Sequence, residues 1–177
     1  LKIFGLIVAF LIQIFISRIL GINKYGLWHE TIAWMNIIIV ISTMGNVKHL
    51  LKEATAFKEV AFIKYINIII QVLIIYVILY LIYYLIASSF NLFSSTEAKL
   101  VLLFALIWGA FKLVNLFNTV MLQARQRNYL TVLLNHIIIP ISTVAVITIF
   151  VLSSNNRVLI LSGFPFAEFI AFAFFFI

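Results

Sequence analysis

Residues 65–87 read YINIIIQVLIIYVILYLIYYLIA, a run with no charged side chain and only two amides. A helix rises 1.5 Å per residue, so about 20 apolar residues are enough to cross the roughly 30 Å hydrocarbon layer of a membrane. This run therefore predicts a transmembrane helix from Tyr65 to Ala87.

The composition of the whole chain agrees with a membrane protein. Hydrophobic residues make up 66% of the 177 positions, the mean hydropathy is +1.24, and 10% of residues are charged. A soluble domain is roughly half apolar and about one quarter charged. A water-soluble globule could not bury this much apolar surface, so we expect an all-α, polytopic transmembrane bundle.

Further apolar runs of similar length lie on both sides of residues 65–87. Together they predict about six spans, at residues 3–20, 30–47, 65–87, 99–122, 129–152 and 158–177, the sixth incomplete. Pro140 is expected to kink the fifth span. Apolar residues from Leu50 to Phe62 recur at helical spacing, which predicts a short amphipathic helix on the membrane surface.

Lys and Arg are distributed unevenly between the two sets of connections. One side has seven, namely Lys2, Lys48, Lys52, Lys58, Lys64, Arg125 and Arg127, and the other has four, Arg18, Lys24, Lys99 and Arg157. The positive-inside rule then predicts a cytoplasmic amino end. The net charge of +7 is spread between apolar runs in this way, so nucleic acid is not an expected partner.

Lys112 lies near the middle of the predicted fourth span, where its side chain cannot easily reach water. A central Lys costs roughly 2.5–3.5 kcal/mol on insertion scales, so something should offset it. Helical spacing places it on one face with Ala105, Gly109, Asn115 and either Asn118 or Thr119. We expect this face to line a substrate cavity; the alternative is a structural ion pair between Lys112 and Glu168.

The first span has a stripe of small and polar residues, Gly5, Ala9, Gln13 and Ser17, at intervals of four. Such a stripe is typical of a helix-packing seam or of a cavity lining. Arg18 near the outer end is either a headgroup-level residue or a fixed cation for an anionic ligand, with Glu30 as its expected partner.

Other polar residues in the spans have two interpretations. Asn36 is a candidate for substrate binding, and Glu30, Glu168 and His136 are candidates for ion coupling. The alternative for each is hydrogen bonding between helices.

Several chemistries are excluded or disfavoured. The chain has no Cys and no Asp, and it has no Gly-rich phosphate loop, no paired catalytic acids and no nucleophile elbow. We expect no cofactor, no metal and no enzymatic activity.

One segment resembles a known pattern. Residues 17–28, SRILGINKYGLW, are similar to the Arg-x-Leu-Gly-x-x-x-Tyr-Gly segment that follows the first helix of polysaccharide exporters and O-antigen flippases, members of the multidrug/oligosaccharidyl-lipid/polysaccharide exporter superfamily. The Met44-Gly45 turn and the loop at residues 123–129, QARQRNY, also resemble this family.

The resemblance implies a protein of 12 to 14 helices in two lobes, of which this chain would be most of the amino-terminal lobe. It implies a bacterial inner-membrane flippase that moves undecaprenyl-pyrophosphate-linked oligosaccharide by ion-coupled alternating access. Expected partners are the lipid-linked oligosaccharide, membrane lipids and a polysaccharide polymerase. A drug exporter of the same superfamily is the alternative, and a membrane-embedded enzyme of glycan synthesis is a weaker one.

Overall fold

The computed structural model describes residues 2–57, 62–89, 95–153 and 157–175, and within them every regular element is a helix. The elements are α1 (Lys2–Leu20), α2 (Ile22–Thr43), α3 (Asn46–Phe57), α4 (Phe62–Ser89), α5 (Thr96–Ala124), α6 (Asn128–Leu133), a π-helical segment (Leu134–Ile138), α7 (Ile139–Ser153), a 3₁₀ segment (Arg157–Ser162) and α8 (Gly163–Phe175). The predicted all-α fold is confirmed.

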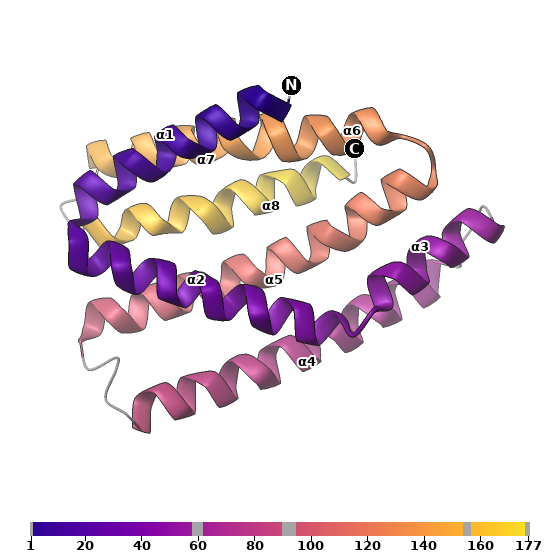
Figure 1. Cartoon of the computed structure of the whole chain (residues 1–177), viewed down its shortest axis with the longest axis horizontal. Coiled ribbons are helices and arrows are strands. Elements are labelled where there is room, and N and C mark those ends of the chain that lie inside the picture. The colour runs from indigo at the N-terminus through magenta and orange to yellow at the C-terminus, as the bar shows by residue number, and fades with distance from the viewer. Residues whose placement is uncertain (1, 58–61, 90–94, 154–156, 176–177) are drawn as a thin grey trace.

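The helices run roughly along the long axis of the molecule in two groups (Figure 1). In one group α7 packs against both α1 and α8, and in the other α2 packs against α4 and α5. Helix α5 also packs along α8, which joins the two groups. Helix α3 and the α5–α6 connection lie at one end of the bundle, and the α1–α2 turn lies at the other (Figure 1).

Among the residues that the structure describes, three helices are long and apolar enough to cross a membrane: Lys64–Ser89, Thr96–Ala124 and Asn128–Ile149. A fourth span is added if α2 and the first part of α3, which meet at a 53° bend, count as one. The apolar parts of α1 and α8, Gly5–Leu20 and Ile160–Ala173, are shorter. The structure thus supports a membrane protein with three to four spans, and the predicted count of about six is not confirmed.

The turn between α1 and α2 is a single residue, Gly21, with a φ of 76° that favours glycine. The second helix therefore begins at Ile22, not near residue 30 as the hydropathy predicted. The turns of α2 before residue 30 pack against α5 through Trp28, which is fully buried and stacks on Trp108 with ring centroids 5.4 Å apart. Gly26 lies inside α2.

The predicted turn at Met44-Gly45 is confirmed, since both residues have positive φ and separate α2 from α3. The predicted amphipathic helix is also present as α3. Its apolar residues Leu50 and Ala54 are buried in the main core, where α3 packs on α5, so this face of the helix contacts protein rather than lipid. Residues 58–61 of the predicted helix lie outside the described part of the chain.

The fifth predicted span is one helix interrupted by a π-helical segment, Leu134–Ile138, just before Pro140. Proline has no N–H to donate to the preceding turn, so the helix changes its hydrogen-bond register near it. This widened turn presents Asn135 and His136 to the space between the two helix groups.

At the α4–α5 interface, buried tyrosine hydroxyls donate hydrogen bonds to main-chain carbonyls. Tyr80 donates to the carbonyl of Leu102 at 2.7 Å, and Tyr76 donates to that of Leu106 at 3.2 Å. Tyr76 can approach α5 this closely because Gly109 has no side chain there. Polar groups in a membrane need such partners, and these bonds fix α5 in position.

Candidate functional site

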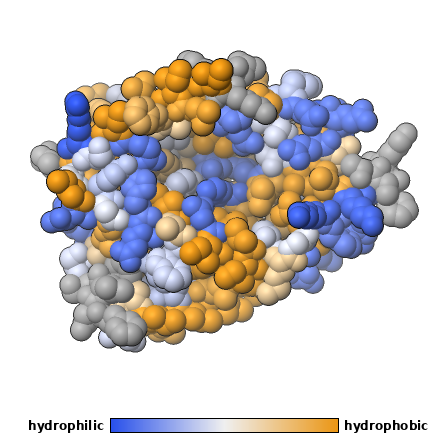
Figure 2. Space-filling view, viewed as in Figure 1, coloured by the Kyte–Doolittle hydropathy of each residue, from blue (hydrophilic) through white to orange (hydrophobic). Residues whose placement is uncertain are grey.

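Two cavities lie between the helix groups and share Asn135 and Glu168 in their linings. The larger, of about 240 Å³, lies among α1, α5, the π-helical segment, α7 and α8. The smaller, of about 190 Å³, lies among α2, α5, the π-helical segment and α8. We call the two together the central cavity. Figure 2 shows a hollow with hydrophilic residues inside it at the centre of one face.

Lys112 lines the central cavity from α5. Its Nζ donates a hydrogen bond of 2.9 Å to Oδ1 of Asn36 on α2 and lies 5.4 Å from the ring centroid of Trp108. The amide oxygen and the negative face of the indole both stabilise an ammonium group. The predicted cavity-facing position of Lys112 agrees with this geometry.

Glu168 lies opposite on α8 and is buried. Its carboxylate accepts a hydrogen bond of 2.6 Å from Nδ2 of Asn115, and the same amide donates to the carbonyl of Glu168 at 2.9 Å. Asn115 is three residues after Lys112, so one face of α5 holds the cation and also the partner of the acid.

No direct ion pair joins Lys112 and Glu168 among the described residues, although each lies in the electrostatic field of the other. Each charge instead has its own amide partner, Asn36 for the cation and Asn115 for the carboxylate. The expected alternative of a direct structural pair is therefore not what the structure shows. Opposite charges held apart on two helices leave a polar space that a ligand could enter.

The stripe on α1 serves both roles that its pattern allowed. A Cβ at Gly5 would lie 2.9 Å from Cβ of His136, so this glycine is where α1 approaches the π-helical segment. Gly5, Ala9 and Gln13 also line the cavity. Oε1 of Gln13 accepts a hydrogen bond of 3.3 Å from the Tyr25 hydroxyl.

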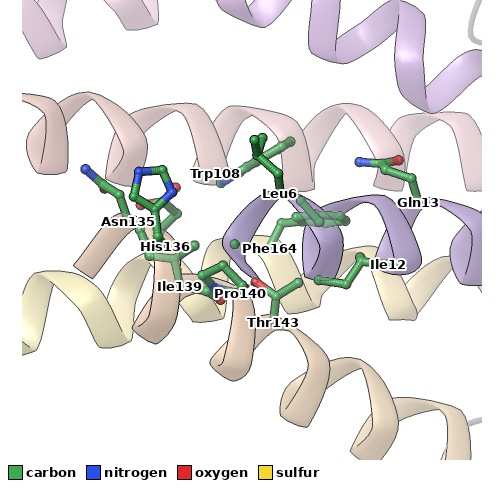
Figure 3. A pocket seen from close by; sticks show the side chains of 13 residues that line it. Leu6, Ile12, Gln13, Trp108, Asn135, His136, Ile139, Pro140, Thr143 and Phe164 are labelled. Carbon is green, nitrogen blue, oxygen red and sulfur yellow. Dashed lines mark hydrogen bonds between the residues drawn. The ribbon is translucent and has the colours of Figure 1, made fainter. Parts of the chain in front are cut away.

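Figure 3 shows Gln13 at one end of the larger cavity and Asn135 and His136 at the other, with Trp108 and Phe164 between them. His136, Pro140 and Thr143 all line this cavity from the fifth predicted span. The His136 ring makes no hydrogen bond to any described residue. It is therefore available to a ligand or to water.

Two predicted site residues lie elsewhere. Arg18 is exposed and lines a separate groove on the outer side of α1 and α7. At 100° per residue, five positions turn a helix by about 140°, so Arg18 faces away from the cavity that Gln13 lines. Glu30 is exposed on α2, and the described residues include no ion pair between it and Arg18. The predicted Arg18–Glu30 pair is wrong.

Asn135 and Trp108 line the cavity and were not predicted from the sequence. Asn135 lines both parts of the cavity. The sequence feature that could have identified it is an Asn-His pair inside an apolar run. Trp108 was also overlooked, although it lies four residues before Lys112 and therefore on the same helix face. Six of the predicted site residues line the cavity or bind its lining residues: Gln13, Asn36, Lys112, Asn115, His136 and Glu168.

Comparisons with known proteins identify no family. No protein-family model matches the chain, and no curated protein or solved structure matches it. The functional argument therefore depends on the chemistry of the cavity. The described cavity lining combines a cation, a carboxylate, several amides and two aromatic faces between apolar helices.

Proposed function

We propose that this chain is the amino-terminal lobe of a flippase that moves undecaprenyl-pyrophosphate-linked oligosaccharide across the bacterial inner membrane by ion-coupled alternating access. One observation carries the proposal: Lys112 and Glu168 face each other across an amide-lined cavity at the middle of the bundle. Intramembrane charges of this kind line pathways for polar solutes.

The chemistry of such a substrate fits the lining. The pyrophosphate would bind to the Lys112 ammonium, because an ammonium is a common ligand of phosphate oxygens. The sugars would hydrogen-bond to amides such as Asn36, Asn135 and Gln13. Glu168 and His136 would be the groups that exchange an ion, since both line the same space.

The proposed topology follows the distribution of basic residues. Helix α3 and the α5–α6 loop lie at one end of the bundle (Figure 1). These segments carry Lys48, Arg125 and Arg127, so the positive-inside rule would place that end in the cytoplasm. A polysaccharide polymerase in the same membrane would be a functional partner.

One observation favours a second candidate, a drug exporter. Glu168 lines the cavity and would attract a cationic drug as readily as Lys112 would attract a phosphate. The two candidates therefore differ in which of the two charges binds the substrate.

The test replaces each charge in the full-length protein and measures two outputs in the same cells. Lys112→Ala should reduce surface polysaccharide at least tenfold, because a charge-assisted bond to phosphate is worth about 1.5–3 kcal/mol. Lys99→Ala, which removes an exposed Lys near the start of the same helix, is the matched control and should leave polysaccharide unchanged.

Membrane insertion of each variant is measured by extraction and blotting. Normal polysaccharide in an inserted Lys112→Ala variant would contradict the flippase proposal. If Glu168→Gln abolishes resistance to a cationic drug while Lys112→Ala does not, the drug-exporter alternative holds instead.

A further inference from the structure

The groove that contains Arg18 lies apart from the central cavity. It has a volume of about 540 Å³ and runs between α1 and α7, lined by Val8, Leu11, Ile12, Ile14, Phe15, Arg18, Val144, Ile147 and Thr148. We call it the lateral groove. Seven of these nine residues are apolar, and Ile12 and Ile147 form a buried floor. Volumes of this size accommodate small organic ligands.

Two polar side chains line the lateral groove, Thr148 and Arg18, and they differ in their hydrogen bonding. The Thr148 hydroxyl donates to the carbonyl of Val144 in its own helix at 2.8 Å. The Arg18 guanidinium, in contrast, is exposed and has no hydrogen bond or ion pair to any residue that the structure describes. A cation that faces an apolar surface without an acidic partner is complementary to an anion attached to a hydrocarbon chain.

The length of the groove gives the size of that hydrocarbon chain. Val8 and Arg18 are ten residues apart on α1, which corresponds to about 15 Å along the helix. This is half of the roughly 30 Å hydrocarbon core, so the groove spans about one leaflet. Arg18 is in the last turn of α1, where the level of the headgroups is expected.

We infer that the lateral groove binds one anionic membrane phospholipid, with an acyl chain between α1 and α7 and its phosphate on the Arg18 guanidinium. Arg suits this role because its planar fork donates two parallel hydrogen bonds to phosphate oxygens. The site is independent of the flippase proposal, because it shares only Ile12 with the central cavity.

The experiment is native mass spectrometry of the full chain in detergent, with phosphatidylglycerol and phosphatidylcholine of identical acyl chains added in equal amounts. The wild type should retain one lipid and prefer phosphatidylglycerol about fivefold, the size expected for one Arg near an anionic headgroup. Arg18→Gln should remove the preference, and Arg18→Lys should keep part of it.

A second pair of variants tests the groove itself. Val144→Trp fills the space between the two helices and should prevent retention of either lipid. Ala145→Trp adds the same bulk at the next, exposed position of α7, which does not line the groove, and should behave as wild type. Arg18→Gln keeps the test valid if Val144→Trp fails to fold, because it alters an exposed side chain.

Three results would overturn the inference. One is an unchanged preference for phosphatidylglycerol in Arg18→Gln. Another is equal lipid retention by Val144→Trp and Ala145→Trp, which would mean that only non-specific annular lipid binds. The third is a wild-type protein that retains no lipid. This outcome includes a dimer in which the second copy covers the groove.

Discussion

Replacing Lys112 with Met distinguishes a cavity residue from a structural one. The substitution keeps the length and the apolar stem of the side chain but removes the charge. If Lys112 held the bundle together through a buried ion pair, its loss would leave an unpaired carboxylate and cost about 3–5 kcal/mol. The structure shows no direct ion pair from Lys112 to Glu168 among its described residues, so we expect a much smaller cost.

The magnitude follows from the contacts that are present. The hydrogen bond to Asn36 is worth about 0.6 kcal/mol, the average for such bonds inside a membrane protein. The cation–π contact with Trp108 adds about 0.5–2 kcal/mol. Removing a mid-span ammonium returns part of the roughly 2.5–3.5 kcal/mol that a central Lys costs. The energy of the two lost contacts and the recovered cost of the mid-span charge nearly cancel. Lys112→Met should therefore change the unfolding free energy by about 1 kcal/mol or less.

The assay is equilibrium unfolding of the full chain in mixed micelles, followed by circular dichroism and tryptophan fluorescence. Lys99→Met, on the exposed surface of the same helix, is the control and should also change stability little. A loss of 3 kcal/mol or more in Lys112→Met alone would refute the reasoning. It would show that Lys112 has a structural role that the separate amide partners do not reveal.

Two further predictions concern packing and topology. Gly5→Val should lower the unfolding free energy by about 1–3 kcal/mol, because its Cβ would lie 2.9 Å from Cβ of His136; an unchanged unfolding transition in the same micelles would contradict this close approach. A Cys at Lys52 should not react with an impermeant thiol reagent added outside intact cells, whereas a Cys at Lys99 should, and the reverse pattern would invert the proposed topology.

The helical class could be predicted because it depends on local composition. Runs such as residues 65–87 leave no alternative to helices when the backbone must satisfy its own hydrogen bonds in lipid. The helix boundaries were harder to predict from the sequence. The start of α2, for example, depends on Trp28 stacking on Trp108, eighty residues away in the sequence. The number of spans depends on helix lengths and on the bend at Met44-Gly45, which hydropathy alone does not give.

The candidate site was predicted in part. Helical spacing correctly grouped Lys112 with Asn115, because both positions lie on one face of an uninterrupted helix. Spacing says which residues share a face but not where that face points, so it could not show that Arg18 lies in the lateral groove. Asn135 was missed because a π-helical turn alters the register around it, and only Pro140 marks that change in the sequence.

The most direct test of the account is whether water reaches the central cavity in the membrane. The chain has no native Cys, so single cysteines can be introduced at chosen positions without background. Asn135→Cys lies in the cavity lining, and Ile141→Cys lies on an exposed side of α7. In permeabilised membranes, a charged thiol reagent should label Asn135→Cys and spare Ile141→Cys. Equal protection of both positions would show a closed, dry interior and contradict a solute-binding cavity.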